Sequence, residues 1–199
     1  TKYRFENGIE YKSPLFIESI FHRYKGELEK VLIVGTRTSF WPALIADYSS
    51  DSEYVNELFL SIESSVKETG ITDVQLLALE ELLSRIHSIP FKLLSHNEEL
   101  TEENIPAISE VYSSAVTHIK KRTKLLLDIT YGFRYMPMLM YQNIQFLNAE
   151  YEFDEIRILY GEYIDASRQI SAVRDISSLW ELSEINKQIF AFESGFDGF

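Results

Sequence analysis

Apolar and polar positions divide the chain into short apolar runs and longer stretches with helical spacing. Compact runs of β-branched and aliphatic residues occur at Lys30–Val34, Lys124–Ile129 and Glu155–Tyr160, and a shorter one at Phe91–Leu94 follows Pro90. Runs of this length are typical of strands that are buried on both faces of a parallel sheet. Between them, apolar residues recur every three or four positions, which predicts amphipathic helices.

The chain opens with a pattern that predicts a β-hairpin and then a short helix. Apolar and polar residues alternate over Tyr3–Tyr11, and Asn7-Gly8 in the middle supplies the two positive-φ positions of a type I′ turn. Ser13-Pro14 then offers an N-cap and a first-turn proline. The predicted helices cover about residues 14–24, a segment with Pro42 near its start, and 55–66, 73–86, 103–121, 136–147 and 179–190.

Strands that alternate with crossover helices predict an α/β fold: a Rossmann-like, doubly wound, mainly parallel sheet with an N-terminal β-hairpin. A chain of 199 residues with 45% hydrophobic content can bury one sizeable core. One globular domain is therefore expected. The sequence starts in strand-like residues and stops just after a helical pattern, so we expect neighbouring elements of a larger protein at both ends.

Composition and charge narrow the classes of partner. The net charge of −12 gives no basic field for long nucleic acid, so any site for a phosphate-containing ligand must be local. The absence of cysteine excludes disulfides and cysteine-rich zinc sites, and favours the cytoplasm. No apolar run approaches the roughly 18 residues that span a bilayer, so no membrane contact is expected.

Two loops contain the residue types that would bind a nucleotide-like ligand. In open parallel sheets, ligands bind beyond the carboxyl ends of the strands, next to helix N-termini. Hydroxyls, backbone amides and arginine suit phosphate oxygens, and aromatic rings stack on bases. The candidate ligand-binding residues are Gly35, Thr36, Arg37, Thr38, Ser39 and Trp41 in the first loop, and Asp128, Thr130, Tyr131, Gly132, Phe133 and Arg134 in the second.

Each loop also has a plain structural interpretation. Strand-to-helix loops commonly contain Gly, Ser and Thr for capping, and neither loop has the spacing of a P-loop or of a GxGxxG motif. Conventional ATP and NAD sites are thus disfavoured. Trp41 could line the pocket or a dimer contact, and Arg134 could instead form a surface ion pair with an acid such as Glu162.

The remaining polar residues predict no catalytic residue, metal site or cofactor. The four histidines lack metal-ligand spacing, and no G-x-S-x-G elbow occurs. Dehalogenase chemistry at Asp128 would need a second aspartate two residues on, where Thr130 stands. We therefore interpret Asp128 as an organiser of its loop, because its carboxylate can accept hydrogen bonds from nearby amides.

Residues Asp128 to Pro137 read Asp-Ile-Thr-Tyr-Gly-Phe-Arg-Tyr-Met-Pro. This segment resembles the DxTHGxRxxP signature of one branch of the CRISPR-associated Rossmann-fold (CARF) proteins. The resemblance extends to Val31–Trp41, to the N-terminal hairpin and to Ile156–Gly161, and is weak between residues 50 and 120. Tyr131 stands where the signature has histidine, which removes an imidazole but keeps an aromatic face.

This resemblance implies a cytoplasmic sensor that binds cyclic tetra- or hexa-adenylate, the second messenger of type III CRISPR defence. The implied assembly is a homodimer whose two pockets join across a two-fold axis. Residues 1–178 would form the sensing domain, and the helix in 179–199 would lead to an effector domain outside this chain. Two alternatives stay open: a metal-independent ring nuclease that uses Arg37, Arg134 and loop hydroxyls, and a scaffold whose pocket is vestigial.

Overall fold

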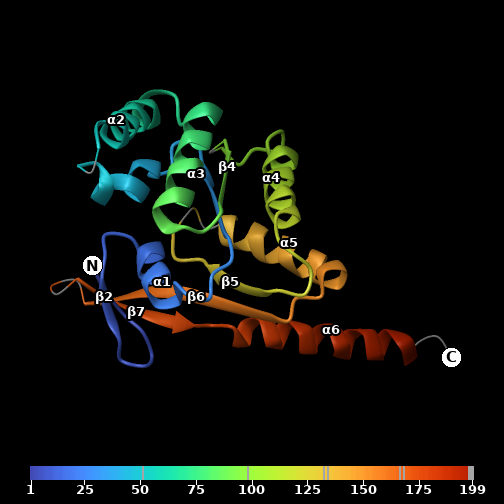
Figure 1. Cartoon of the computed structure of the whole chain (residues 1–199). Helices are drawn as coiled ribbons and strands as arrows, with labels where there is room; N and C mark the ends of the chain where they lie inside the picture. Colours follow the sequence, from blue (N-terminus) through green and yellow to red (C-terminus); the bar gives the residue numbers. More distant parts are fainter. Residues whose placement is uncertain are drawn as a thin grey trace.

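The computed structural model of the chain describes residues 1–50, 52–97, 99–131, 133, 135–165, 167 and 169–196, except for the side chains of 116, 149 and 190–196 (Figure 1). Strands and helices alternate over most of its length. Their bounds are β1 (Lys2–Arg4), β2 (Glu10–Lys12), α1 (Phe16–Tyr24), β3 (Val31–Thr36), the 3₁₀ helix η1 (Trp41–Tyr48), α2 (Glu53–Glu68), α3 (Asp73–His87), β4 (Phe91–His96), α4 (Ile105–Thr117), β5 (Lys124–Asp128), α5 (Tyr135–Tyr151), β6 (Glu155–Asp165), β7 (Ile170–Asp175) and α6 (Ser178–Phe196).

The strands form two sheets. One has the order β2-β1-β7-β6-β5 and the other consists of β3 and β4. The pairs β1–β7, β3–β4 and β5–β6 are parallel, while β1–β2 and β6–β7 are antiparallel. The predicted α/β fold with a mainly parallel sheet is confirmed, but β7 and the last five residues of β6 were not predicted.

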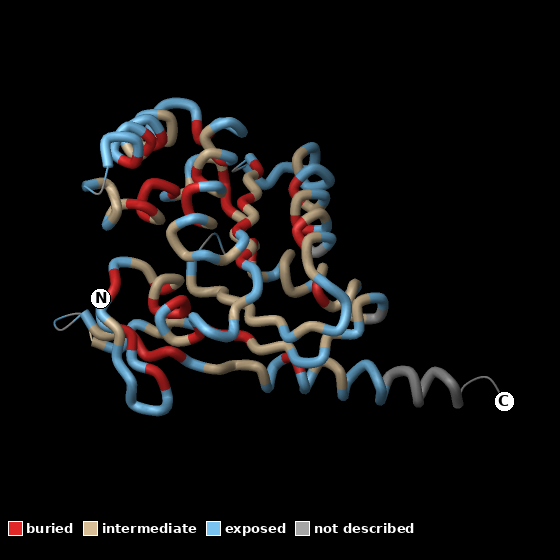
Figure 2. The backbone as a smooth tube through the Cα atoms, viewed as in Figure 1, coloured by how far each residue is buried: buried red, intermediate tan, exposed pale blue. Residues whose placement is uncertain are grey.

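Helices cover both faces of the strands. A core around the fully buried Ile45, Ile62 and Leu79 packs α1, η1, α2 and α3 against one face of β3 and β4. On the other face, buried Tyr112 and Met136 join α4 to α5. Buried positions lie on the sides of the helices that face the strands and within β3, β4 and β7, whereas β5 is only half-buried (Figure 2).

The hairpin is present, but its turn differs from the predicted type I′. Gly8 has a φ of 81°, whereas Asn7 does not have a positive φ. Phe5 N–H donates to the Ile9 carbonyl and Gly8 N–H to the Phe5 carbonyl, both at 2.9 Å. This is a three-residue loop, a type I turn followed by a left-handed glycine. The Asn7 side chain accepts a hydrogen bond from Ile9 N–H instead of supplying a second left-handed residue.

The first helix also begins later than its sequence indicates. Helix α1 starts at Phe16, with Leu15 as its N-cap, and no side chain caps it. The Ser13 hydroxyl donates to the Glu18 carboxylate and accepts a hydrogen bond from Leu15 N–H at 3.3 Å. Ser13 thus organises the approach to the helix without being its cap.

Strands β3 and β5 belong to different sheets, but the segments that lead into them lie side by side. Lys30 Nζ, just before β3, donates to the His118 carbonyl at 3.1 Å, and Lys120 pairs with Glu29 at 3.1 Å. The residues that lead into β3 therefore lie beside the segment that leads into β5. At the other end, the ring of Tyr135 after β5 lies 6.3 Å from that of His96 at the end of β4, so the carboxyl ends of β3, β4 and β5 lie at one edge. No helix in the described part of the chain is long and apolar enough to cross a membrane.

Candidate functional site

The loop after β3 is closed by its own hydrogen bonds. Ser39 Oγ accepts from Thr36 N–H at 2.8 Å and lies 3.0 Å from Thr36 Oγ1. The indole N–H of Trp41 donates to the Thr36 carbonyl at 2.8 Å, and its ring is almost fully buried. Thr36 is buried too, whereas Thr38 is exposed. Of the three hydroxyls, that of Thr38 is the most accessible to a ligand.

Gly35 is required by the close approach of this loop. A Cβ atom at Gly35 would lie 2.8 Å from Trp41 Cζ2 and 3.0 Å from Ser39 Oγ. Gly35→Ala should therefore destabilise the protein by about 1–3 kcal/mol, the usual cost of overpacking. Urea denaturation measures this, with Gly26→Ala as control because a Cβ there meets no atom within 4 Å. Equal stability of the two variants would contradict the prediction.

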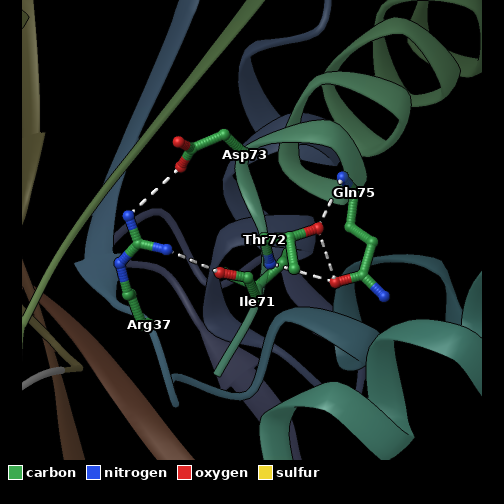
Figure 3. Close-up of polar contacts among 5 residues, drawn as sticks. All are labelled: Arg37, Ile71, Thr72, Asp73 and Gln75. Atoms are coloured by element: carbon green, nitrogen blue, oxygen red, sulfur yellow. Dashed lines mark hydrogen bonds and ion pairs between the residues drawn. The ribbon is translucent and has the colours of Figure 1, made fainter. Parts of the chain in front are cut away.

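Arg37 points along the edge toward the start of α3 (Figure 3). Its guanidinium donates to the Ile71 carbonyl at 3.3 Å and pairs with the exposed Asp73 carboxylate at 3.3 Å. Its carbonyl accepts from Ile71 N–H at 2.8 Å. Arg37 also lines a pocket of about 180 Å³ with Asn97 and Asn104 at the carboxyl end of β4. Because an exposed ion pair contributes little, the guanidinium can exchange Asp73 for another anion.

The loop after β5 is organised by Asp128 and Thr130. Asp128 Oδ1 accepts from Thr130 N–H at 2.8 Å, and Thr130 Oγ1 accepts from Gly161 N–H of β6 at 2.9 Å. Burial raises the pKa of Asp128 to about 6, although the hydrogen bonds from Thr130 act in the opposite direction. The hydrogen bond that Asp128 was expected to accept from its own loop is therefore present, and its role as loop organiser stays a prediction.

Tyr131 presents a ring to solvent that is held by the N-terminal hairpin. Its side chain is 58% exposed, and its hydroxyl lies 2.8 Å from that of Tyr3, which is 2% exposed. Burial, and then the hydrogen bond with Tyr131, raise the pKa of Tyr3 above its ordinary value. No local pattern predicts this contact, because the two residues are 128 positions apart.

Further aromatic rings extend this edge toward β4. The rings of Phe133 and Tyr135 stack with centroids 5.9 Å apart, and Phe133 is 51% exposed. Tyr135 in turn lies 6.3 Å from the buried ring of His96. Nε2 of His96 is 3.4 Å from the hydroxyl of Tyr112. These rings connect the loop after β5 to the end of β4.

Two of the predicted ligand residues, Gly132 and Arg134, lie outside the described residues. Glu162, the acid proposed as a surface partner for Arg134, pairs with Arg174 at 2.7 Å.

The two loops lie at the same end of one large cavity. Gly35, Ser39 and Trp41 line it from the first loop, and Asp128 and Tyr131 from the second. The cavity has a volume of about 1550 Å³. No group of three or more His, Cys, Asp or Glu side chains suited to a metal ion occurs among the residues that the structure describes. The site thus offers exposed aromatic rings and hydroxyls beside the half-buried carboxylate of Asp128.

Comparison with known proteins identifies the family. The model of the CARF domain of the CRISPR system endoribonuclease Csx1 matches residues 1–166. This chain belongs to the CARF-domain family. The CRISPR-associated protein MJ1674 of Methanocaldococcus jannaschii is 24% identical to it over 210 residues, which cover 96% of this chain and 32% of that protein. The chain thus spans about a third of the length of this relative.

The family match covers both candidate loops of this CARF domain, together with the hairpin that contacts Tyr131. Helix α6, from Ser178, lies beyond the matched residues. The comparisons therefore support a sensor role connected with CRISPR for the part of the chain that carries the candidate site.

Proposed function

We propose that this CARF domain binds a cyclic oligoadenylate, cyclic tetra- or hexa-adenylate, in type III CRISPR defence and thereby controls an attached effector allosterically. The observation that carries the proposal is the meeting of two strand-end loops at one cavity within the residues that match the family. CARF domains in general bind cyclic oligoadenylates, and a carboxyl-end site suits such an anion.

The two loops supply different parts of the recognition. Tyr131 and Phe133 expose ring faces on which adenine bases can stack. Thr38, Ser39, Arg37 and Arg134 are the proposed partners of the phosphates and riboses, together with backbone amides. Asp128 is assigned no direct ligand contact, because an anion beside the phosphates would repel them.

The proposed active form is a cytoplasmic homodimer in which each protomer binds half of the ring, since a two-fold ligand suits a two-fold interface. Residues 1–178 form the proposed sensing domain, and residues 179–199 lead to the effector. Helix α6 supports this division because it presents a row of half-exposed apolar side chains: Leu179, Leu182, Ile185 and Ile189. Such a row suits packing against another helix.

Calorimetric titration with cyclic tetra-adenylate, cyclic hexa-adenylate and linear tetra-adenylate tests the proposal. We expect heat with one of the two rings, a stoichiometry of one ring to two chains, and weaker binding of the linear oligomer. Chromatography of the titrated solution should recover an intact ring, whereas linear products would favour the ring nuclease. No heat with either ring at micromolar protein would overturn the proposal.

Tyr3→Phe should weaken binding of the ring by roughly 2- to 10-fold, because it removes the hydroxyl that holds the exposed ring of Tyr131. This range corresponds to the net value of about 0.5–1.5 kcal/mol for one hydrogen bond. Tyr54→Phe, on an exposed residue of α2, is the matched control and should bind like the parent. Parental affinity of Tyr3→Phe would show that the contact does not position Tyr131 for the ligand.

A further inference from the structure

Two neighbouring aromatic residues at the end of the loop after β3 differ sharply in exposure. Trp41 is 2% exposed, and its indole N–H donates to the Thr36 carbonyl at 2.8 Å. Its ring packs so closely over Gly35 that a Cβ atom there would lie 2.8 Å from Cζ2. Phe40, the residue before it, is 75% exposed. Trp41 thus fills the interior position, and Phe40 is the ring that a ligand can reach.

The backbone holds Phe40 in this outward position. Its φ of −75° and ψ of 53°, with a hydrogen bond from Trp41 N–H to the Ser39 carbonyl at 2.7 Å, form an inverse γ-turn centred on Phe40. The Phe40 carbonyl accepts from Ala43 N–H at 3.1 Å, which ties the turn to η1. Because the backbone is already fixed, little ordering is needed when the ring is covered by a ligand.

The surroundings of Phe40 contain the other groups that a nucleotide needs. Phe40 lines the cavity to which Asp128 and Tyr131 of the second loop also contribute. Tyr131 is 58% exposed, so each loop presents an aromatic ring at this edge. Thr38, two residues before Phe40, is exposed and offers a hydroxyl for a ribose or a phosphate. A phenyl ring has no hydrogen-bond donor, so the part of a nucleotide that it can recognise is the flat face of the base.

Exposure alone does not distinguish Phe40, because Phe146 on α5 is 82% exposed. Helix α5 begins at Tyr135, after the second loop, and ends at Tyr151. The Tyr151 carbonyl accepts from Arg122 N–H, just ahead of β5. Phe146 therefore lies toward the opposite edge of the sheet, away from the strand-end loops. Phe40 combines an exposed ring with a place at the candidate site, and Phe146 is its matched control.

We propose that Phe40 is a base-stacking residue of the ligand site, on which one adenine of the bound cyclic oligoadenylate packs. This inference rests on the proposed function and adds to it a residue that determines affinity for the base. Phe40 then has the role that Trp41, with its buried ring, cannot perform. The loop after β3 thereby contacts a base through Phe40 and the sugar-phosphate part of the ring through its exposed polar groups.

Calorimetric titration of Phe40 variants with the ring that binds the parent tests the proposal. Phe40→Ala should weaken binding by roughly 5- to 150-fold, the range that alanine substitution gives for one stacked base. Phe40→Leu should lose most of the same affinity, because leucine is apolar but has no aromatic face. Phe40→Trp should bind at least as tightly as the parent. Phe146→Ala should also bind like the parent.

Fluorescence of Phe40→Trp gives a direct readout of stacking. The two native tryptophans, Trp41 and Trp180, are both buried, so the introduced indole is the exposed one. Its emission should be quenched as the ring is added, with the same saturation point as the calorimetric heat, because a stacked adenine covers the indole face. Phe146→Trp, with an indole at the opposite edge, should show no such quenching.

Three results would overturn the proposal. Parental affinity of Phe40→Ala, in a protein whose parent binds the ring, would remove Phe40 from the site and leave the proposed function intact. Sedimentation of ligand-free Phe40→Ala as a smaller species than the parent would show that the ring packs against a second chain instead of a base. Absence of binding to either ring by the parent itself would overturn the proposed function and this inference together.

Discussion

Asp128→Asn is expected to stabilise the protein by about 3 kcal/mol at pH 8 and by little at pH 4. Burial raises the pKa of this carboxyl from 3.8 to about 6, and each pKa unit corresponds to about 1.4 kcal/mol. A group with a raised pKa in the folded state contributes its full stability below the unfolded pKa and loses it as the pH rises through the folded pKa. Asparagine carries no charge, and its Oδ1 can still accept from Thr130 N–H.

Urea denaturation of parent and variant between pH 4 and pH 8 measures the difference. Asp175→Asn is the control, because the pH dependence that Asp175 gives to the free energy of unfolding has the opposite sign. Burial acts against its ionisation, but hydrogen bonds from Ser177 and Arg157 outweigh this and lower the pKa of Asp175. The free energy of unfolding contributed by Asp175 is therefore lost as the pH falls. A stability difference between parent and Asp128→Asn that does not depend on pH would contradict the account of Asp128.

Arg134→Ala is expected to weaken binding of the cyclic oligoadenylate by roughly 10- to 150-fold. A charge-assisted hydrogen bond to phosphate contributes about 1.5–3 kcal/mol. Arg134→Lys should recover part of the loss, because an ammonium cannot reproduce the planar fork of a guanidinium. The thermal midpoint of the free protein should hardly change.

Arg174→Ala is the matched control for Arg134→Ala. Arg174 pairs on the surface with Glu162, and such exposed pairs contribute little. Its variant should bind the ring like the parent. If Arg134→Ala also binds like the parent, the phosphate contact belongs to Arg37 or to backbone amides.

Most of the fold could be predicted because buried parallel strands leave continuous apolar runs in the sequence. Strand β7 could not, since its buried residues include Ser171 and Ala172, which are too small to mark a strand. Both residues lie in a strand that pairs with β1 on one side and β6 on the other, and this backbone pairing, not large apolar side chains, holds the strand in place. The turn type at Asn7-Gly8 depended likewise on loop length, which the dipeptide alone does not determine.

The candidate site was predictable as two loops but not as a network. The local sequence predicted that Asp128 would organise its own loop, because the hydrogen bond involved joins residues only two positions apart, Asp128 and Thr130. The contacts of Tyr131 with Tyr3 and of Arg37 with Asp73 join distant segments. No periodicity or capping rule links such positions, because tertiary packing alone brings them together.

A ¹H–¹⁵N NMR titration with the ring that binds in calorimetry tests the central claim most directly. The amides of Thr38 and Ser39 and those from Thr130 to Phe133 should shift together, with saturation at one ring per two chains. The tip of the hairpin at Asn7 and the exposed side of α2 should hardly respond. Saturable binding with shifts confined to other parts of the chain, and none in the two loops, would contradict the account.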